Sequence, residues 1–160
     1  MSRPDDIIFT QAESGDSAVE NLFVYGKLNY DFNNDDMYVG DTHNKKSVMN
    51  DNTIKVSNIT NKEDGILITG LPHDSDYSEQ TLNNMIDDMQ KWQKIRMMGA
   101  AALAACYVAS GKVEQYQEKG IYLWDVIGGA AIVESSGGAA KIFNQRENFQ
   151  VDVVFSNSNI

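Results

Sequence analysis

The residues best suited to do chemistry are Glu118 and Asp125, which both lie in the segment EKGIYLWDVIGGAAIVESSGG, residues 118–138. Asp125 directly follows Trp124 and precedes a run of small residues that predicts a helix. A carboxylate at a helix start can accept backbone N–H groups, and the helix dipole favours its negative charge. Asp125 is thereby a fixed, ionised oxygen ligand, suited to a hard cation such as Mg²⁺. The alternative is that Asp125 serves only as the helix N-cap, a frequent role of aspartate.

The residue pattern changes once along the chain, and its two parts indicate the elements that must position these residues. Residues 1–60 are rich in Asn and Asp and hold short strand-like pieces. We expect strands at 21–30, 37–39 and 53–57, a turn at 31–36 and an exposed loop at 42–52. This first part therefore predicts an antiparallel β meander.

From Gly65 onward, strand and helix patterns alternate. We expect strands at 66–69, 94–98, 113–117, 140–143 and 151–155, and helices that start at Ser78 and cover 100–110 and 125–135. The helix after Ser78 carries an apolar stripe that we interpret as a core face: Leu82, Met85, Ile86 and Met89. The alternation predicts an α/β fold with a largely buried sheet, and we divide the chain at residues 1–60 and 61–160.

Composition restricts the number of domains and the cellular compartment of the protein. The chain has 160 residues, enough for one domain, and no apolar run long enough to span a membrane. Met1 is not followed by a basic segment and an apolar core, so we expect no signal peptide. A single cysteine, Cys106, excludes an internal disulfide and fits a reducing compartment, so we expect a cytoplasmic protein with a buried structural thiol.

The net charge of −10 bears on the partners. It argues against a nucleic-acid backbone as partner. It would also repel a phosphorylated ligand unless metal ions supply local positive charge.

The segment 118–138 resembles the C-terminal signature of the inositol monophosphatase family, the Mg²⁺-dependent, lithium-sensitive phosphatases. Glu118, Trp124-Asp125-Val126, the small-residue run and Gly137-Gly138 follow that signature in order and spacing. Ser135 stands where the family usually has a second Glu, and Glu134 comes one place early.

The resemblance extends over about residues 20–160. It includes the segments Val24–Gly40, Thr53–Ser57, Leu67–Pro72, Ile95–Tyr107 and Val151–Asn159. It implies that the chain is the C-terminal part of the layered α-β-α-β-α sandwich of the inositol-phosphatase and fructose-bisphosphatase type, preceded by the short meander.

The resemblance also implies roles for single residues. Asp125 matches a metal ligand of the family, and Glu118 matches a residue that hydrogen-bonds substrate hydroxyls. Gly99, Ala100 and Ala101 match a turn beside the substrate, and Ala100 replaces the usual Ser or Thr. His73 falls in a loop that borders the substrate in relatives, although a lone histidine in such a loop is more often simply solvated.

The catalytic set is incomplete in this chain. The family's Glu-Glu segment and its Asp-Pro-Ile-Asp-Gly-Thr motif, which supply most metal ligands, do not occur among the 160 residues. Glu13 and Asp16 are conceivable substitutes, but an acidic tail is the simpler interpretation. One carboxylate cannot fix a catalytic Mg²⁺, which several oxygens normally hold. We therefore expect the missing motif in an upstream segment or in a partner chain.

Three hypotheses follow. The first is the C-terminal portion of a metal-dependent phosphomonoesterase for a small polyol or sugar phosphate, inactive as this chain alone. The second is a non-catalytic interaction protein, and the third is a ligand-binding module that uses Glu118 and the turn at Gly99 without metal. An uncovered sheet face or edge would also favour a homo-oligomer.

Overall fold

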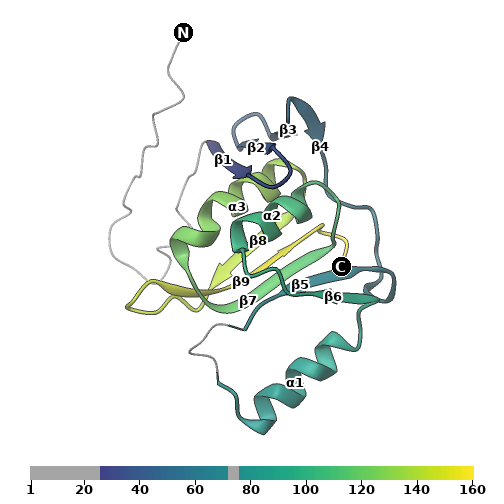
Figure 1. Ribbon diagram of the computed structural model, residues 1–160, viewed down its shortest axis with the longest axis vertical. Coiled ribbons are helices and arrows are strands. Elements are labelled where there is room, and N and C mark those ends of the chain that lie inside the picture. Colours follow the sequence, from purple (N-terminus) through teal and green to yellow (C-terminus); the bar gives the residue numbers. More distant parts are fainter. Residues whose placement is uncertain (1–25, 72–75) are drawn as a thin grey trace.

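In the computed structural model, which describes residues 26–71 and 76–160, two β-sheets lie on opposite sides of a pair of helices (Figure 1). The first sheet is an antiparallel meander of β1 (Gly26–Asp31), β2 (Asp36–Asp41), β3 (Lys46–Met49) and β4 (Asn52–Ile54). The helices between the sheets are α2 (Ala101–Ala109) and α3 (Leu123–Ser135). The predicted α/β class and the predicted meander are both confirmed. No helix in the described ranges is long and apolar enough to cross a membrane.

The second sheet is mixed and has the strand order β6-β5-β7-β9-β8. Its strands are β5 (Ile66–Thr69), β6 (Lys94–Arg96), β7 (Gln115–Tyr122), β8 (Ala139–Phe143) and β9 (Gln150–Ser156). β5 runs parallel to both β6 and β7, whereas β7, β9 and β8 pair antiparallel. A short 3₁₀ turn, η1 (Lys62–Asp64), precedes β5. β7 thus occupies the centre of the sheet and leads directly into α3.

Small residues let α2 and α3 pack closely. Ala104, Ala105 and Cys106 on α2 are fully or almost fully buried, as are most residues of α3. A Cβ on Gly129 would overlap the Cβ of Ala105, so only glycine fits at this crossing. The predicted burial of Cys106 is confirmed, and burial raises the pKa of its thiol to about 11.

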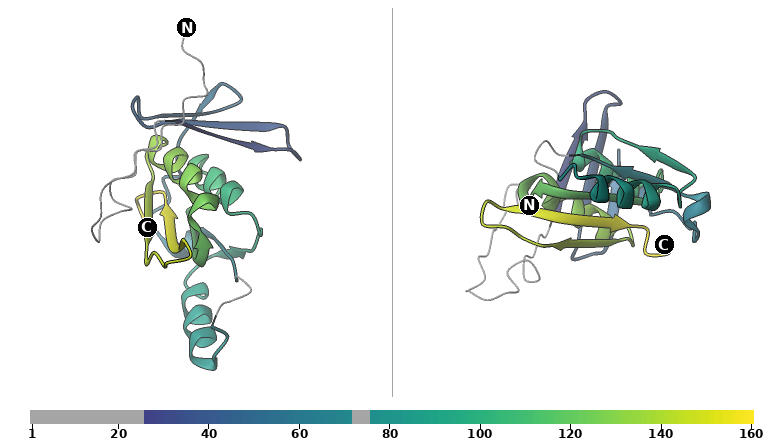
Figure 2. Two further views of the ribbon diagram at one scale, coloured as in Figure 1. Left: turned by 90° about the vertical axis from the view of Figure 1, so that its left-hand side faces the viewer. Right: turned by 90° about the horizontal axis from the view of Figure 1, so that it is seen from below.

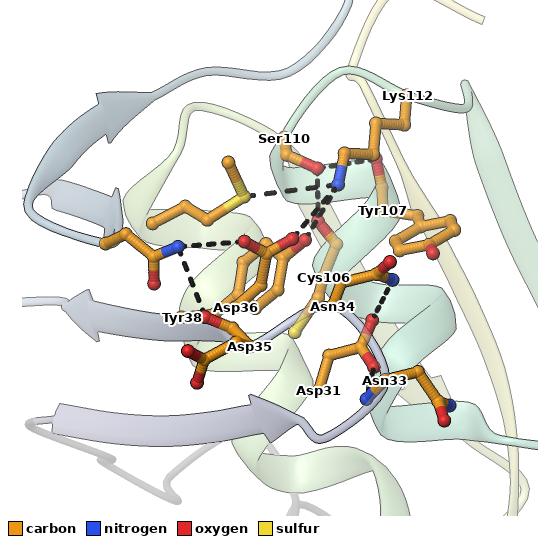
Figure 3. A network of polar contacts seen from close by, with 12 residues as sticks. Asp31, Asn33, Asn34, Asp35, Asp36, Tyr38, Cys106, Tyr107, Ser110 and Lys112 are labelled. Atoms are coloured by element: carbon orange, nitrogen blue, oxygen red, sulfur yellow. Dashed lines mark hydrogen bonds and ion pairs between the residues drawn. The ribbon is translucent and has the colours of Figure 1, made fainter.

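The meander is fixed to this helix pair at two places. A Cβ on Gly40 would lie 2.7 Å from the Cα of Ile132, and the Ser47 hydroxyl donates to the Ile132 carbonyl at 2.7 Å. The Lys112 ammonium donates to the buried Tyr38 hydroxyl at 3.0 Å (Figure 3). It also lies 4.8 Å from the centre of the Tyr107 ring, where a cation is attracted.

The outer face of the meander is apolar and exposed. Leu28 pairs with Val39 and Tyr30 with Met37 across β1 and β2, so these side chains share the face opposite the buried Tyr38. Leu28, Tyr30 and Met37 are exposed. The left view of Figure 2 shows the meander at the outside of the described structure, with the helices beneath it.

The helix α1 (Glu79–Met89) corrects one prediction. Ser78 is its N-cap and accepts from the Thr81 N–H at 3.4 Å, as expected. Its apolar stripe was predicted to face the core, and this is wrong because no residue of α1 is buried. The helix extends away from the five-stranded sheet (Figures 1 and 2), and Asp88 ties it to β7 by accepting from Gln117 at 2.7 Å.

Smaller corrections concern element bounds. The loop predicted at 42–52 contains β3, which pairs with β2 and reaches α3 through Ser47. β7 is longer than the strand predicted at 113–117, and α3 begins before Asp125. The remaining strands lie close to their predicted places. Residues 21–25 of the first predicted strand lie outside the described residues.

Candidate functional site

The junction between β7 and α3 places Asp125 in the first helical turn. Tyr122 is the N-cap residue, with extended φ and ψ of −79° and 140° and no capping by its side chain. The Leu123 N–H still donates to the Phe149 carbonyl beside β9 at 3.0 Å, and the helix begins at this residue. The N-cap interpretation of Asp125 is therefore wrong, because the helix begins at Leu123.

The carboxylate of Asp125 is exposed, and no described residue donates a hydrogen bond to it. Its place in the first turn still favours negative charge, because the N-terminal end of the helix dipole is positive. The site thus offers a carboxylate whose oxygens are open to a ligand.

Asp125 lines a pocket of about 420 Å³ that four segments build. They are Asn29 of β1, residues 99–102 at the start of α2, Ile121 of β7, and Trp124, Asp125, Gly128 and Gly129 of α3. The glycines and alanines keep the pocket open, since no long side chain fills it. The structure thus brings together four of the predicted site residues: Gly99, Ala100, Ala101 and Asp125.

The start of α2 faces this pocket without a side-chain cap. Gly99 has a φ of +65°, a conformation that favours glycine, and Ala100 is the extended N-cap residue. Alanine has no oxygen to accept the first backbone N–H groups, which therefore remain donors at the positive end of the helix dipole. Such a helix start suits an anion such as phosphate.

Glu118 lies on β7 beside the pocket but is not one of the residues that line it. Its carboxylate accepts from the Tyr116 hydroxyl at 2.9 Å. Burial raises its pKa, the Tyr116 hydrogen bond lowers it, and the charge of Asp125 raises it again. Burial is the main cause of the net rise in the pKa of Glu118, and the charge of Asp125 adds to it.

A β-bulge separates Glu118 from Ile121. The register of β7 against β9 shifts between these residues, and Gly120 has a φ of +73°. The buried Asp152 holds the bulge by accepting the Gly120 N–H at 3.0 Å. Bulges re-aim side chains beside functional sites, and this one sets Ile121 into the pocket wall.

The residues described here do not form a metal site by themselves. Within residues 26–71 and 76–160, no three His, Cys, Asp or Glu side chains are grouped so that they could hold a metal ion. Asp125 alone does not fit the several oxygens that Mg²⁺ requires. His73, the other candidate, lies outside the described residues.

Ser135, which replaces a Glu of the family signature, is buried and donates to the Ala131 carbonyl at 2.7 Å. Glu134 next to it is exposed. The substitution therefore places a hydroxyl that bonds its own helix inside the core, and the neighbouring carboxylate outside it.

Asn29 and Trp124 are among the residues of the pocket wall that sequence reasoning did not assign to the site. Asn29 faces inward between two outward residues of β1 and donates to the Ala102 carbonyl at 3.3 Å. The alternation of β1 could have indicated this polar inward position. Trp124 is exposed and stacks on Tyr122 with ring centres 4.7 Å apart, which no pattern in the sequence signals.

The two sheets on either side of a helix pair define the fold class, a layered α/β sandwich. The family model described as "Inositol monophosphatase family" matches residues 25–157. The chain therefore belongs to the inositol monophosphatase family, as the signature predicted.

Among curated proteins, Nus factor SuhB of Pasteurella multocida is 36% identical over 105 residues, which are 60% of this chain and 36% of that protein. Inositol monophosphatase 1 of Mus musculus is 33% identical over 109 residues, which are 65% of this chain and 38% of that protein. The chain thus matches well under two thirds of the length of these relatives.

Solved structures agree on the fold. The inositol monophosphatase of Anabaena (Nostoc) has a TM-score of 0.77 at 26% identity, and the match covers 88% of this chain and 56% of that one. The extragenic suppressor protein suhB of Bartonella henselae has a TM-score of 0.75 at 25% identity, with 85% and 53% covered. The predicted C-terminal part of the layered sandwich is confirmed.

Proposed function

We propose that this chain supplies the ligand-binding side of a phosphomonoesterase that hydrolyses a small polyol or sugar phosphate. The observation that carries this proposal is the pocket itself. An unpaired carboxylate, Asp125, and the uncapped start of α2 face the same space of about 420 Å³. A pocket with both a carboxylate and free backbone N–H donors suits a phosphate ester bound together with a cation.

Each predicted residue has a defined task in this proposal. The backbone N–H groups that follow Ala100 donate to the anionic end of the ligand, and Glu118 accepts hydrogen bonds from its hydroxyl groups. Asp125 contributes one ligand oxygen to a cation. Bound Mg²⁺ would polarise the phosphate and activate water in such a site. The described residues do not hold this ion alone.

Completion of the site requires further carboxylates from another segment. The relatives support this requirement, because the matched part is only 36% and 38% of the lengths of two of them. We propose that an N-terminal-half segment with an Asp-Pro-x-Asp-Gly-Thr motif supplies them. The chain on its own is then inactive. The single, buried Cys106 supports a reducing compartment, and we place the protein in the cytoplasm.

The test is reconstitution. The chain is mixed with, or fused to, the N-terminal part of a relative, and phosphate release from inositol monophosphate is measured with Mg²⁺ and with EDTA. We expect Mg²⁺-dependent release that Asp125→Asn abolishes and that Asp87→Asn, an exposed carboxylate on α1, leaves unchanged. Folded, assembled samples that release no phosphate would overturn the proposal.

A second candidate, an interaction protein without catalysis, is favoured by the outer face of the meander. Leu28, Tyr30 and Met37 form an exposed apolar patch that a partner or a second copy would cover. Self-association should then rise with concentration in light scattering and fall in a Leu28→Ser/Met37→Ser variant. A clean monomer at high concentration would contradict self-association through this face.

A further inference from the structure

The carboxylate of Glu118 is held from two sides by residues with no assigned role. Tyr116, two positions earlier on β7, donates its hydroxyl to Oε2 at 2.9 Å. Gly70 lies beside it at the end of β5, since Thr69 and Gln117 are partners in the parallel pairing. A Cβ on Gly70 would lie only 2.5 Å from Cδ of Glu118.

Glycine at position 70 leaves the space that the Glu118 carboxylate occupies. Gly70 is not among the residues with positive φ, so alanine could adopt its backbone conformation. A methyl group at position 70 would instead displace the Glu118 carboxylate from its place over the Gly70 backbone. We call this space at the end of β5 the carboxylate seat.

Tyr116 is a fixed donor. It is almost fully buried, and its ring meets Phe155 edge-on with ring centres 5.9 Å apart. Burial and then the charge of Glu118 raise the pKa of its hydroxyl, so Tyr116 stays protonated and donates. A hydroxyl on a ring locked in the core can hold its acceptor in one position.

The second oxygen of Glu118 remains open. In the described part of the chain, Oε1 accepts no hydrogen bond, and the charged group that acts on Glu118 is Asp125, another anion. An open anionic acceptor near a second carboxylate suits neutral donors such as hydroxyl groups. It repels a second phosphate.

We propose that Tyr116 and Gly70 are positioning residues, which hold Glu118 so that Oε1 accepts hydroxyl groups from the uncharged end of a polyol monophosphate. The nature of the ligand rests on the proposed function, whereas the positioning of Glu118 does not.

The first experiment tests, in the absence of ligand, the hydrogen bond from the Tyr116 hydroxyl to the Glu118 carboxylate. The Glu118 carboxyl is followed by carbon NMR in ¹³C-glutamate-labelled chain, and its signal is assigned by its loss in Glu118→Gln. In Tyr116→Phe the pKa of Glu118 should rise, because the hydrogen bond that favours the charged form is removed. Tyr107→Phe, which removes a hydroxyl on α2, should leave it unchanged. An unchanged pKa of Glu118 in Tyr116→Phe would overturn the proposed role of this hydrogen bond.

The second experiment tests the seat by a double-mutant cycle in urea. Gly70→Ala should lower the folding equilibrium constant about three- to tenfold, because the methyl group displaces the Glu118 carboxylate from the Tyr116 hydroxyl. In a Glu118→Ala background the same change should cost less than about threefold, because the space is then free. Equal losses in both backgrounds would show that Glu118 does not occupy the seat.

The third experiment separates positioning from the proposed function. In the reconstituted phosphatase, Tyr116→Phe should raise KM for inositol monophosphate about tenfold while kcat changes little. Hydrolysis of p-nitrophenyl phosphate, which lacks these hydroxyls, should not change. Equal losses on both substrates would overturn the hydroxyl role. Absence of all activity would overturn the proposed function, while the first two experiments still decide the positioning.

Discussion

Replacement of Asp152 by alanine should destabilise the chain by about 2–3 kcal/mol, because one buried carboxylate holds the β7 bulge. Asp152 accepts the Gly120 N–H at 3.0 Å, the Asn144 amide at 2.9 Å and the Arg146 guanidinium at 2.9 Å. Its side chain is 6% exposed. Alanine leaves all three donors without their acceptor.

The three donors contribute unequally. The partly buried Gly120 N–H would be left without a partner, which costs about 1–3 kcal/mol. The Arg146 side chain is 44% exposed and can return to water, so its ion pair contributes at most about 1 kcal/mol. Asn144 is exposed and is rehydrated as well.

Asp152→Asn is the matched control. Its amide oxygen can still accept the Gly120 N–H, so it should cost only about 1 kcal/mol. Urea unfolding of both variants at pH 7, followed by circular dichroism, measures the difference. Equal costs for the two variants, or a cost below about 0.5 kcal/mol for alanine, would refute this account of the bulge.

The pH dependence gives an independent check. Burial alone would raise the pKa of Asp152, but the hydrogen bonds from Asn144, Arg146 and Gly120, with the charge of Arg146, lower it below the usual 3.8. The stabilisation is therefore complete above the unfolded value and is lost as pH falls through the folded one. The gap between wild type and Asp152→Ala should be constant above about pH 5 and should narrow below about pH 4. A gap that widens in acid would contradict this.

Three further predictions follow from the packing. Gly129→Val should destabilise by about 1–3 kcal/mol in urea, because its side chain overlaps Ala105; the double variant with Ala105→Gly should recover much of the loss. Lys112→Met should lower the free energy of unfolding by about 1 kcal/mol, because the ammonium group donates a hydrogen bond to Tyr38. A change within about 0.3 kcal/mol would show that this hydrogen bond does not stabilise the fold. Cys106 should react with a thiol reagent at pH 8 only after urea unfolds the chain, because burial raises its pKa to about 11; prompt reaction of the folded chain would contradict its burial.

Local patterns were enough for elements that carry their own signals. The strand at 66–69 was predicted with its observed bounds, because a β-branched run there ends at Gly70. Ser78 was predicted as a helix start, and its hydroxyl caps α1. The family was recognisable because the segment 118–138 keeps its residue order and spacing.

Other features depend on contacts between distant segments. β3 was missed because Ser47, a polar residue in an apparent loop, faces inward to bond the carbonyl of Ile132. The stripe on α1 has the period of a core face, but no described element buries it. The place of Asp125 in the first turn follows from the start of α3 at Leu123, directly after β7, which the sequence does not signal.

The candidate site was foreseeable in its residue types more than in its geometry. The predicted roles of Asp125, Glu118 and the turn at Gly99 came from the resemblance, and they remain predictions. The pocket wall also includes Asn29, which comes from a strand distant in sequence. Periodicity gives the inward side of a strand, but it does not say which helix lies there.

The most direct measurement of the central claim is phosphate release from inositol monophosphate by the chain alone and by the chain joined to the N-terminal part of a relative, each with and without Mg²⁺. The account predicts no turnover by the chain alone, Mg²⁺-dependent turnover by the joined protein, and loss of that turnover in Asp125→Asn. Turnover by the chain alone, or full turnover by the joined Asp125→Asn variant, would contradict it.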